Sequence, residues 1–148
     1  IRSKDTARVI EFDTRMDGVF ISRHRADGMI VATPTGSTAY ALSGGGPVLH
    51  PALESIALVP ICPHTLSDRP LVIDASRHIE IDICATNRHA LLLTTDGQAN
   101  HELVTGDKVS IRSAEHKLQL IHPPGYDYFS VLRRKLSWGR ESTGSVSS

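Results

Sequence analysis

The chain has 148 residues, and its sixteen Lys and Arg residues balance sixteen Asp and Glu residues, so the formal net charge at pH 7 is zero. This balance argues against a nucleic-acid-binding module, because such modules gain much of their affinity by neutralising phosphates. No apolar run approaches the roughly 20 residues that a membrane-spanning helix needs. The two cysteines, Cys62 and Cys84, are too few for a disulfide framework. We therefore expect a soluble, cytoplasmic protein with neither nucleic acid nor membrane as a partner.

Most of the hydrophobic pattern has the period of two that is typical of strands. Alternating apolar and polar residues predict strands with one buried face at Ile79–Ile83, Val109–Ile111 and Leu118–Leu120. Continuous apolar runs predict strands buried on both faces at Val19–Ile21, Met29–Ala32, Ile56–Val59 and Ala90–Leu93, and we make the same prediction for Val9–Phe12, in which only Glu11 is polar. About eight short strands result, which predicts a mainly β fold of the multi-stranded, β-sandwich-like kind.

Glycine-containing pairs separate these runs. Asp17-Gly18, Asp27-Gly28 and Asp96-Gly97 each lie between apolar runs. Asp-Gly in this position predicts a hairpin, because a type I′ turn needs positive φ at both central residues. Gly106-Asp107 separates two further runs.

Two short helices complete the predicted elements. The first, Gly36–Ser43, ends at three consecutive glycines, and the second begins after Asp127, a candidate N-cap, with apolar residues at helical spacing up to Leu136. The last ten residues, 139–148, are rich in Gly and Ser and predict a disordered tail. Residues 1–138 are therefore expected to form one domain. Because the chain begins with Ile1 instead of Met, we expect it to be part of a longer protein.

The least ordinary segment is the hydroxyl-rich Thr33–Ser43, which follows a predicted buried strand and opens a helix. Thr35, Ser37 and Thr38 are candidate N-caps. A helix start leaves backbone N–H groups without partners and carries partial positive charge, which suits an anionic or carbonyl-bearing ligand. The alternative is an ordinary strand–turn–helix corner whose hydroxyls satisfy only its own amides. No lysine follows in the pattern of a phosphate-binding P-loop.

The order of several motifs resembles the NAD kinase family. The motifs are Asp27-Gly28, Thr33–Tyr40, Leu42-Ser43, Gly45–Pro47, Pro63–Ser67, Arg69–Leu71, Asp96–Gln98, Leu120–Pro123, and Tyr126 with Tyr128-Phe129. They cover nearly the whole chain up to Trp138. As the resemblance implies, members of this family phosphorylate the adenosine ribose 2′-hydroxyl of NAD to make NADP, using ATP or polyphosphate, and they assemble as dimers or tetramers.

The resemblance also implies an organisation in two domains, an α/β half with a Gly-Gly-Asp-Gly motif and a mostly β C-terminal half. The sequence has no Gly-Gly-Asp-Gly, and the Asn-Glu pair of the family would lie just before Ile1. The chain therefore resembles the C-terminal, NAD-binding domain alone, without the N-terminal catalytic α/β domain. No catalytic residue is expected in this chain, and the isolated chain is expected to be inactive.

The resemblance implies a set of NAD-binding residues, which are Arg8, Arg25, Asp27, Thr38, Ala39, Tyr40, Ala41, Leu42, Ser43 and Gln98. The carboxylate of Asp27 can accept from a carboxamide, and the amide of Gln98 can both donate and accept. Tyr40 offers an aromatic face with a polar tip.

Each of these residues also has a simpler interpretation. Asp27 is otherwise a turn residue, Arg25 a solvated surface charge, and Gln98 an exposed strand start. Tyr40 and Leu42 would pack a short helix onto the core, and we expect Leu42 to be structural.

The eight histidines are scattered, without the Cys/His clustering of a zinc site. We read His64 as part of a structural loop. No protein metal site is expected; the divalent cation of the reaction, Mg²⁺, would be bound together with the ATP phosphates. Two alternatives to a kinase fragment stay open, namely a non-catalytic NAD-binding or regulatory module and a lipid kinase domain of the diacylglycerol or sphingosine type. A purely structural β-sandwich is the third.

Overall fold

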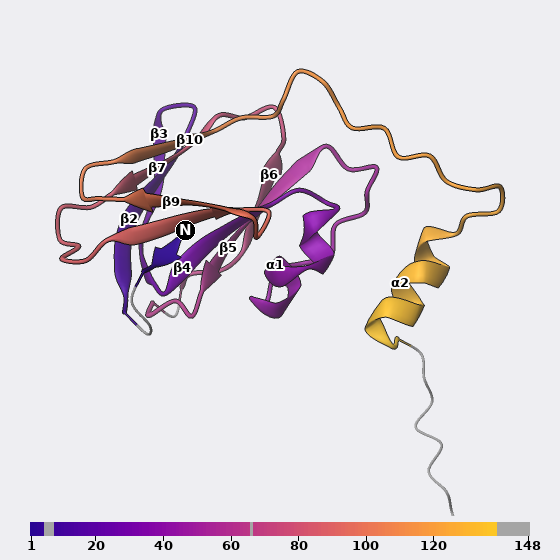
Figure 1. Cartoon of the computed structure of the whole chain (residues 1–148), viewed down its shortest axis with the longest axis horizontal. Helices are drawn as coiled ribbons and strands as arrows, with labels where there is room; N and C mark the ends of the chain where they lie inside the picture. Colours follow the sequence, from indigo (N-terminus) through magenta and orange to yellow (C-terminus); the bar gives the residue numbers. More distant parts are fainter. Residues whose placement is uncertain (5–7, 66, 139–148) are drawn as a thin grey trace, which may run out of the picture. The chain divides into compact units, whose positions relative to one another are not determined.

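The computed structural model describes residues 1–4, 8–65 and 67–138, so the tail predicted to be disordered lies outside the described residues. The chain divides into two compact units, Ile1–Ala114 and Glu115–Ser148. The first unit contains the strands β1–β10 and the short helix α1, and the second contains the helix α2 (Figure 1). The predicted mainly β fold with two short helices is therefore confirmed.

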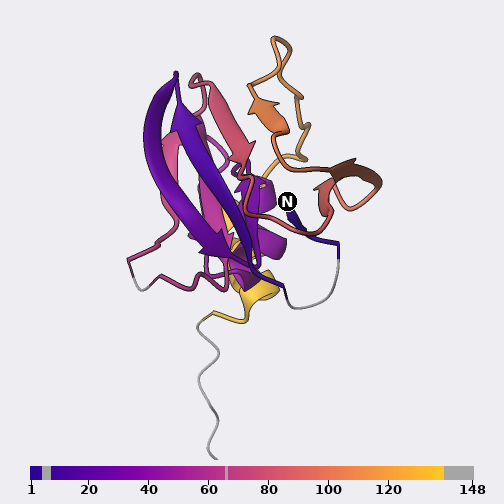
Figure 2. The ribbon, with the colours of Figure 1, turned by 90° about the vertical axis from the view of Figure 1, so that its left-hand side faces the viewer.

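The described strands of the first unit form two antiparallel sheets. The six-stranded sheet has the order β6-β5-β4-β1-β8-β9 and the four-stranded sheet the order β10-β7-β2-β3. The strands of the larger sheet are β1 Arg2–Ser3, β4 Gly28–Ala32, β5 Ser55–Ile61, β6 Leu71–Asp74, β8 Leu91–Thr95 and β9 Ala99–Leu103. Those of the smaller sheet are β2 Ile10–Met16, β3 Val19–Ala26, β7 Ile79–Ile83 and β10 Lys108–Ile111. Figure 2 shows β2 and β3 as a long, curved hairpin at the edge of the unit.

The main core consists of side chains from both sheets, as in a sandwich. Ile79, Ile81 and Ile83 are buried at alternate positions of β7, which confirms the period-two prediction for this strand. Phe12 of β2 is the largest fully buried side chain. The other members of this cluster are Ile10, Ala26, Met29, Ile56, Leu58, Leu91 and Leu103.

A second apolar cluster confirms that β4 and β5 are buried on both faces. Ala57 and Val59 of β5 pack with Ala41 of α1 (Tyr40–Ser43), whereas Ile56 and Leu58 belong to the main core. The helix predicted at residues 36–43 is thus confirmed, although it divides into a 3₁₀ turn, Gly36–Thr38, and α1. Its packing covers the face of the sheet opposite to the main core.

Three other runs were predicted to be buried on both faces, and for these the prediction was wrong. In Val9–Phe12, Val9 is 37% exposed, and in Val19–Ile21, Val19 is 68% exposed and Phe20 50%. Val19 and Phe20 lie on β3, an edge strand of the smaller sheet. In β8, Leu91 is buried and Leu93 packs against the main core, whereas Leu92, on the other face, belongs to neither apolar cluster of the described residues. An apolar run does not reveal whether a second layer covers the outer face.

The alternating segment Leu118–Leu120 was also predicted to be a strand, and this was wrong. The segment has no regular secondary structure, and Leu118 and Leu120 are 86% and 58% exposed. Alternation favours a strand only where a neighbouring strand can pair with it, because the backbone hydrogen bonds must be satisfied. The strands β1, β6 and β9, conversely, were not predicted from the sequence.

Two of the three Asp-Gly pairs form the predicted turns. Asp17 and Gly18 have φ values of 50° and 78°, and Asp96 and Gly97 have values of 49° and 70°, as a type I′ hairpin turn requires. Asp27-Gly28 is not a hairpin, because β3 and β4 belong to different sheets and the chain crosses between them at this point.

The helix α2 of the second unit, Tyr128–Leu136, begins as predicted. The carboxylate of Asp127 accepts a hydrogen bond from the N–H of Phe129 at 3.0 Å, which makes Asp127 the N-cap. Leu132 is buried, whereas Phe129 is 55% exposed. The helices that the structure describes lack the length and hydropathy of a transmembrane segment.

Candidate functional site

Two predicted binding residues, Arg25 and Asp27, lie where β3 ends and the chain crosses to the other sheet. The loop after β5 closes against them, because the N–H of His64 donates to the Arg25 carbonyl at 2.8 Å and the N–H of Asp27 donates to the Ile61 carbonyl at 2.9 Å. Nε2 of His64 lies 3.8 Å from Oδ1 of Asp27. The Asp27 side chain keeps 40% of its surface exposed, so its carboxylate is open to a ligand.

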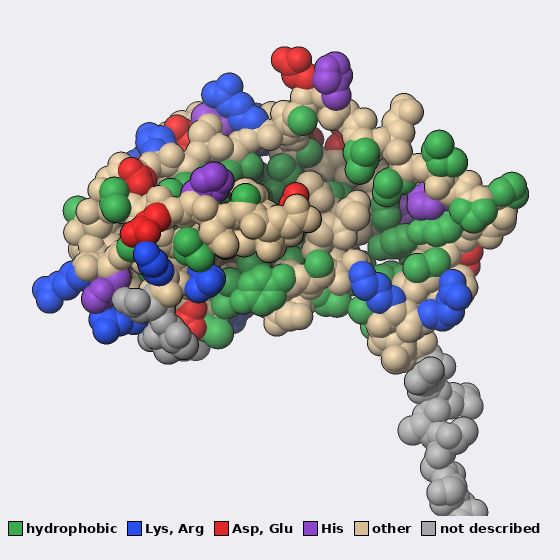
Figure 3. All heavy atoms as spheres, in the orientation of Figure 1, with side chains coloured by type: hydrophobic (Ala, Val, Ile, Leu, Met, Phe, Trp, Pro, Cys, Tyr) green, Lys and Arg blue, Asp and Glu red, His purple; other side chains and the backbone are tan. Residues whose placement is uncertain are grey.

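Arg25 also borders a polar cleft of about 320 Å³ that contains Arg8. Nε of Arg25 pairs with Oε1 of Glu11 at 3.0 Å, and the Arg8 guanidinium contacts the His89 ring. The lining residues are Arg8, Val9, Glu11, Arg25, Thr86, Asn87, Arg88 and His89. Three arginines against one glutamate give this cleft an excess of positive charge, which suits an anionic group. Elsewhere on the face of the first unit shown in Figure 3, basic and acidic side chains are interspersed.

The segment that follows β7 holds Glu11, one of the residues that line the cleft, in position. The side-chain oxygen of Asn87 accepts from the Glu11 N–H at 2.9 Å, and its amide nitrogen donates to the Glu11 carbonyl at 2.7 Å. The hydroxyl of Thr86 donates to Oε2 of Glu11 at 2.7 Å. Thr86 and Asn87, which are distant from Glu11 in the sequence, therefore hold Glu11 in place. Glu11 in turn orients Arg25.

The hydroxyl-rich corner, Thr33–Ser43, uses part of its hydroxyls internally. Ser37 is fully buried; its hydroxyl donates to the Pro34 carbonyl at 2.6 Å and accepts from the Leu49 N–H at 3.0 Å. The Thr38 hydroxyl donates to the Thr35 carbonyl at 3.4 Å. None of the three predicted N-caps accepts a capping hydrogen bond at the start of either short helix. That prediction was wrong, because a 3₁₀ turn with its own backbone bonds replaces a regular first helical turn.

The remaining predicted residues of this corner differ in exposure. Tyr40 is 61% exposed, and Ala39 and Ser43 are exposed, so these side chains can reach a ligand. Ala41 is 1% exposed and belongs to the second core cluster, and Leu42 is half-buried. The Ala41 side chain therefore holds the helix in place on the core.

Gln98 lies on a third element, the turn between β8 and β9. Its N–H donates to the Thr95 carbonyl at 2.9 Å, and its side chain is exposed. The structure thus places the predicted binding residues in three groups: the end of β3 with its cleft, the α1 corner and the β8–β9 turn. Glu11 and His89 were not predicted as site residues. His64 was predicted to belong to a structural loop, although it lies in the motif Pro63–Ser67, and its ring lies beside the Asp27 carboxylate.

Among the described residues, no group of three or more His, Cys, Asp or Glu side chains is arranged to hold a metal ion. The candidate site consists of hydrogen-bonding, aromatic and charged groups, such as Asp27, Tyr40 and Arg25. Such groups bind and orient a polar, anionic ligand.

Comparison with known protein families assigns the chain to one of them. The family described as the ATP-NAD kinase C-terminal domain matches residues 1–123. The chain belongs to this family. It is 52% identical over 135 residues to an NAD kinase of Halorhodospira halophila, covering 91% of the chain and 44% of that relative, and 48% identical over 141 residues to an NAD kinase of Acinetobacter baylyi, covering 95% and 46%. The chain thus spans less than half the length of these relatives.

Solved structures agree with this assignment. An NAD kinase from Archaeoglobus fulgidus in complex with ATP superposes with a TM-score of 0.69 at 38% identity, covering 77% of this chain and 43% of the other. Yeast NADH kinase complexed with NADH gives a TM-score of 0.67 at 39% identity, covering 74% and 31%. The resemblance drawn from the sequence motifs is therefore confirmed.

Proposed function

We propose that this ATP-NAD kinase C-terminal domain supplies the NAD-binding half of an NAD kinase, which phosphorylates the adenosine ribose 2′-hydroxyl of NAD. The observation that carries the proposal is the identity of 52% and 48%, over 91% and 95% of the chain, to relatives named NAD kinase. The solved neighbours hold ATP or NADH. These matches favour a dinucleotide substrate over the lipid alternative.

The chemistry of the three groups supports the same proposal. The exposed Asp27 carboxylate can accept from the N–H₂ of a carboxamide, the excess positive charge of the cleft beside Arg25 suits a phosphate, and the exposed Tyr40 ring can stack on a base. Phosphoryl transfer depends mainly on positioning and on neutralising charge. In this proposal the chain positions NAD, while the catalytic base belongs to a part of the enzyme outside this sequence.

The cation, the donor and the assembly follow from the same proposal. Mg²⁺ would accompany the phosphates of ATP, or polyphosphate would serve as donor, without a protein metal site in this chain. The enzyme would be a cytoplasmic homo-oligomer, a dimer or tetramer. NADP formation by the isolated chain should be negligible in an assay with NAD, ATP and Mg²⁺, and robust formation would contradict the proposed division of roles.

Calorimetric titration of the chain with NAD tests the binding role. Asp27→Ala should weaken binding by about 10- to 100-fold, since a hydrogen bond to a charged group contributes about 1.5–3 kcal/mol. Asp17→Asn is the matched control, because it removes a carboxylate from the Asp-Gly turn at the opposite end of β3 and should leave binding unchanged. Equal heats for wild type and Asp27→Ala would overturn the assignment of Asp27, and no heat with wild type would overturn NAD binding by this half.

A further inference from the structure

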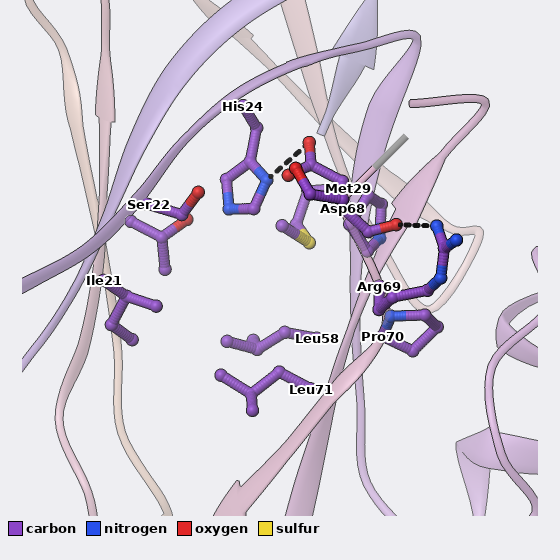
Figure 4. Close-up of a pocket in the computed structure, with 12 residues that line it drawn as sticks. Ile21, Ser22, His24, Met29, Leu58, Asp68, Arg69, Pro70 and Leu71 are labelled. Carbon is purple, nitrogen blue, oxygen red and sulfur yellow. Dashed lines mark hydrogen bonds and ion pairs between the residues drawn. The ribbon is translucent and has the colours of Figure 1, made fainter. Parts of the chain in front are cut away.

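The pocket between the two sheets and the polar cleft described above differ in chemical character. The pocket, of about 240 Å³, has an apolar floor that includes Met29, Leu58 and Leu71 (Figure 4). Its two buried titratable side chains pair with each other, with 3.2 Å between Nδ1 of His24 and Oδ2 of Asp68. The polar cleft, of about 320 Å³, is lined mainly by charged and polar residues instead. An anionic ligand therefore finds its counter-charges in the cleft.

The residues that line the polar cleft carry an excess of positive charge. Three of them are arginines, Arg8, Arg25 and Arg88, and Glu11 is the one carboxylate among them. His89 adds no charge, because an arginine side chain only donates and the ring nitrogen that contacts Arg8 therefore accepts. The positive charges of the described lining residues thus exceed the negative charges by two.

Two of the three guanidinium groups keep their charge available for a ligand. Nε of Arg25 pairs with Glu11 at 3.0 Å. Arg8 and Arg88, in contrast, are exposed, and neither forms an ion pair with a carboxylate in the part of the chain that the structure describes. Like charges gathered in one cleft repel one another, so a bound anion would stabilise the arrangement.

The wall of the cleft that carries Arg88 is ordered without a ligand. Asn87, the preceding residue, bonds to both backbone groups of Glu11 on β2, and its side-chain nitrogen also donates to the Cys84 carbonyl at 2.8 Å. The N–H of Cys84 donates in turn to the Glu11 carbonyl at 3.2 Å. Arg88 and His89 follow this anchored residue directly, so a ligand meets a backbone that is already in place and the entropic cost of binding is small.

We propose that the polar cleft binds a diphosphate group through Arg8 and Arg88. The fork of N–H donors on a guanidinium matches two oxygens of one phosphate, so each of these arginines suits one phosphate. Two such groups, together with an excess of two positive charges, fit two linked phosphates better than a single one. Where the diphosphate is that of NAD, the inference rests on the proposed function and adds Arg88 to its binding residues; a separate diphosphate ligand has the same chemistry.

Calorimetric titration of the full chain with sodium pyrophosphate, without Mg²⁺, tests the proposal. Wild type should bind pyrophosphate, and Arg88→Gln should weaken binding by about tenfold, the lower end of the effect of a hydrogen bond to a charged group, because this side chain is exposed. Arg112→Gln is the matched control, since Arg112 is exposed, does not line the cleft and loses the same charge; it should leave binding unchanged. The proposal is wrong if wild type does not bind pyrophosphate or if both variants weaken binding equally.

Arg8→Gln is the second variant, because Arg8 reaches the cleft from the segment before β2. It should weaken pyrophosphate binding by about the same factor as Arg88→Gln. Both side chains are exposed, so the melting temperatures of the two variants should equal that of wild type. Unchanged binding in Arg8→Gln would overturn the proposal, which needs both guanidinium groups.

Repeating the pyrophosphate titration in the presence of NAD identifies the source of the diphosphate. If NAD occupies the cleft, the apparent affinity for pyrophosphate falls as the NAD concentration rises, and Arg88→Gln also weakens NAD binding. If both bind at once, the cleft serves a separate diphosphate ligand. NAD titrated alone tests the proposed function independently: no heat with NAD, together with pyrophosphate binding that depends on Arg88, would contradict the NAD-binding role and support the diphosphate site.

Discussion

Replacing Ser37 with alanine removes a buried hydroxyl that ties two segments of the candidate site together. The hydroxyl donates to the Pro34 carbonyl at the start of the corner and accepts from the Leu49 N–H beyond the glycine run, at 2.6 Å and 3.0 Å. Ser37→Ala is therefore expected to destabilise the first unit and to loosen the chain around α1.

The magnitude follows from the bonds lost. Two intramolecular hydrogen bonds contribute about 0.5–1.5 kcal/mol each, so the free energy of unfolding should fall by about 1–3 kcal/mol. The void that alanine leaves is only one oxygen atom in size, so the cavity contribution is small. With a urea m-value of about 1–3 kcal/mol/M, the midpoint of unfolding should fall by about 1 M.

Urea unfolding followed by circular dichroism measures this change. Ser43→Ala is the matched control, because its hydroxyl is exposed at the end of α1; a surface change of this kind is expected to stay within about 0.5 kcal/mol. If Ser37→Ala changed the free energy of unfolding no more than Ser43→Ala does, the two hydrogen bonds of the Ser37 hydroxyl would not stabilise the fold as inferred.

Two further predictions concern packing and pH. A Cβ at Gly46 would lie 2.7 Å from Cγ2 of Val59, so Gly46→Ala should lower the free energy of unfolding by about 1–3 kcal/mol, measured by the same urea titration; an unchanged midpoint would contradict the tight approach. Arg23 donates to Asp13 at 2.6 Å and 2.8 Å, and these bonds are the main reason why the pKa of Asp13 is lowered. The pair therefore stabilises the fold above the pKa of an unfolded aspartate, about 3.9, and this contribution is lost as pH falls through the lower, folded pKa. Because the Arg23 side chain is 63% exposed, Asp13→Asn should cost only about 0.2–1 kcal/mol at pH 7, and the difference from wild type should vanish in acid; a difference that grew as pH fell would refute this sign.

The local signals that predicted the fold correctly are those in which short-range chemistry suffices. Alternation at Ile79–Ile83, the Asp17-Gly18 and Asp96-Gly97 turns and the Asp127 cap all depend on residues a few positions apart. Leu118–Leu120 shows where this reasoning ends, since its alternation has no strand to pair with. Asp27-Gly28 is a similar case, because the sequence does not show that the flanking strands belong to different sheets.

For the candidate site, the motifs in the sequence indicated candidate residues but not their surroundings. Asp27 and Arg25 were expected, yet the presence of His64 beside Asp27 depends on β5 pairing with β4. The burial of Ala41 depends on α1 packing on β5. Each of these contacts joins segments distant along the chain.

The sequence by itself determined the family, the mainly β class and most strands, because motifs, periodicity and turn chemistry are local properties of the chain. Only the tertiary structure decided which apolar runs are covered on both faces, which hydroxyls of the corner turn inward, and that Thr14, Ser22, His24 and Asp68 meet in one pocket. Those features arise from the packing of one sheet on the other, and no stretch of residues encodes that packing alone.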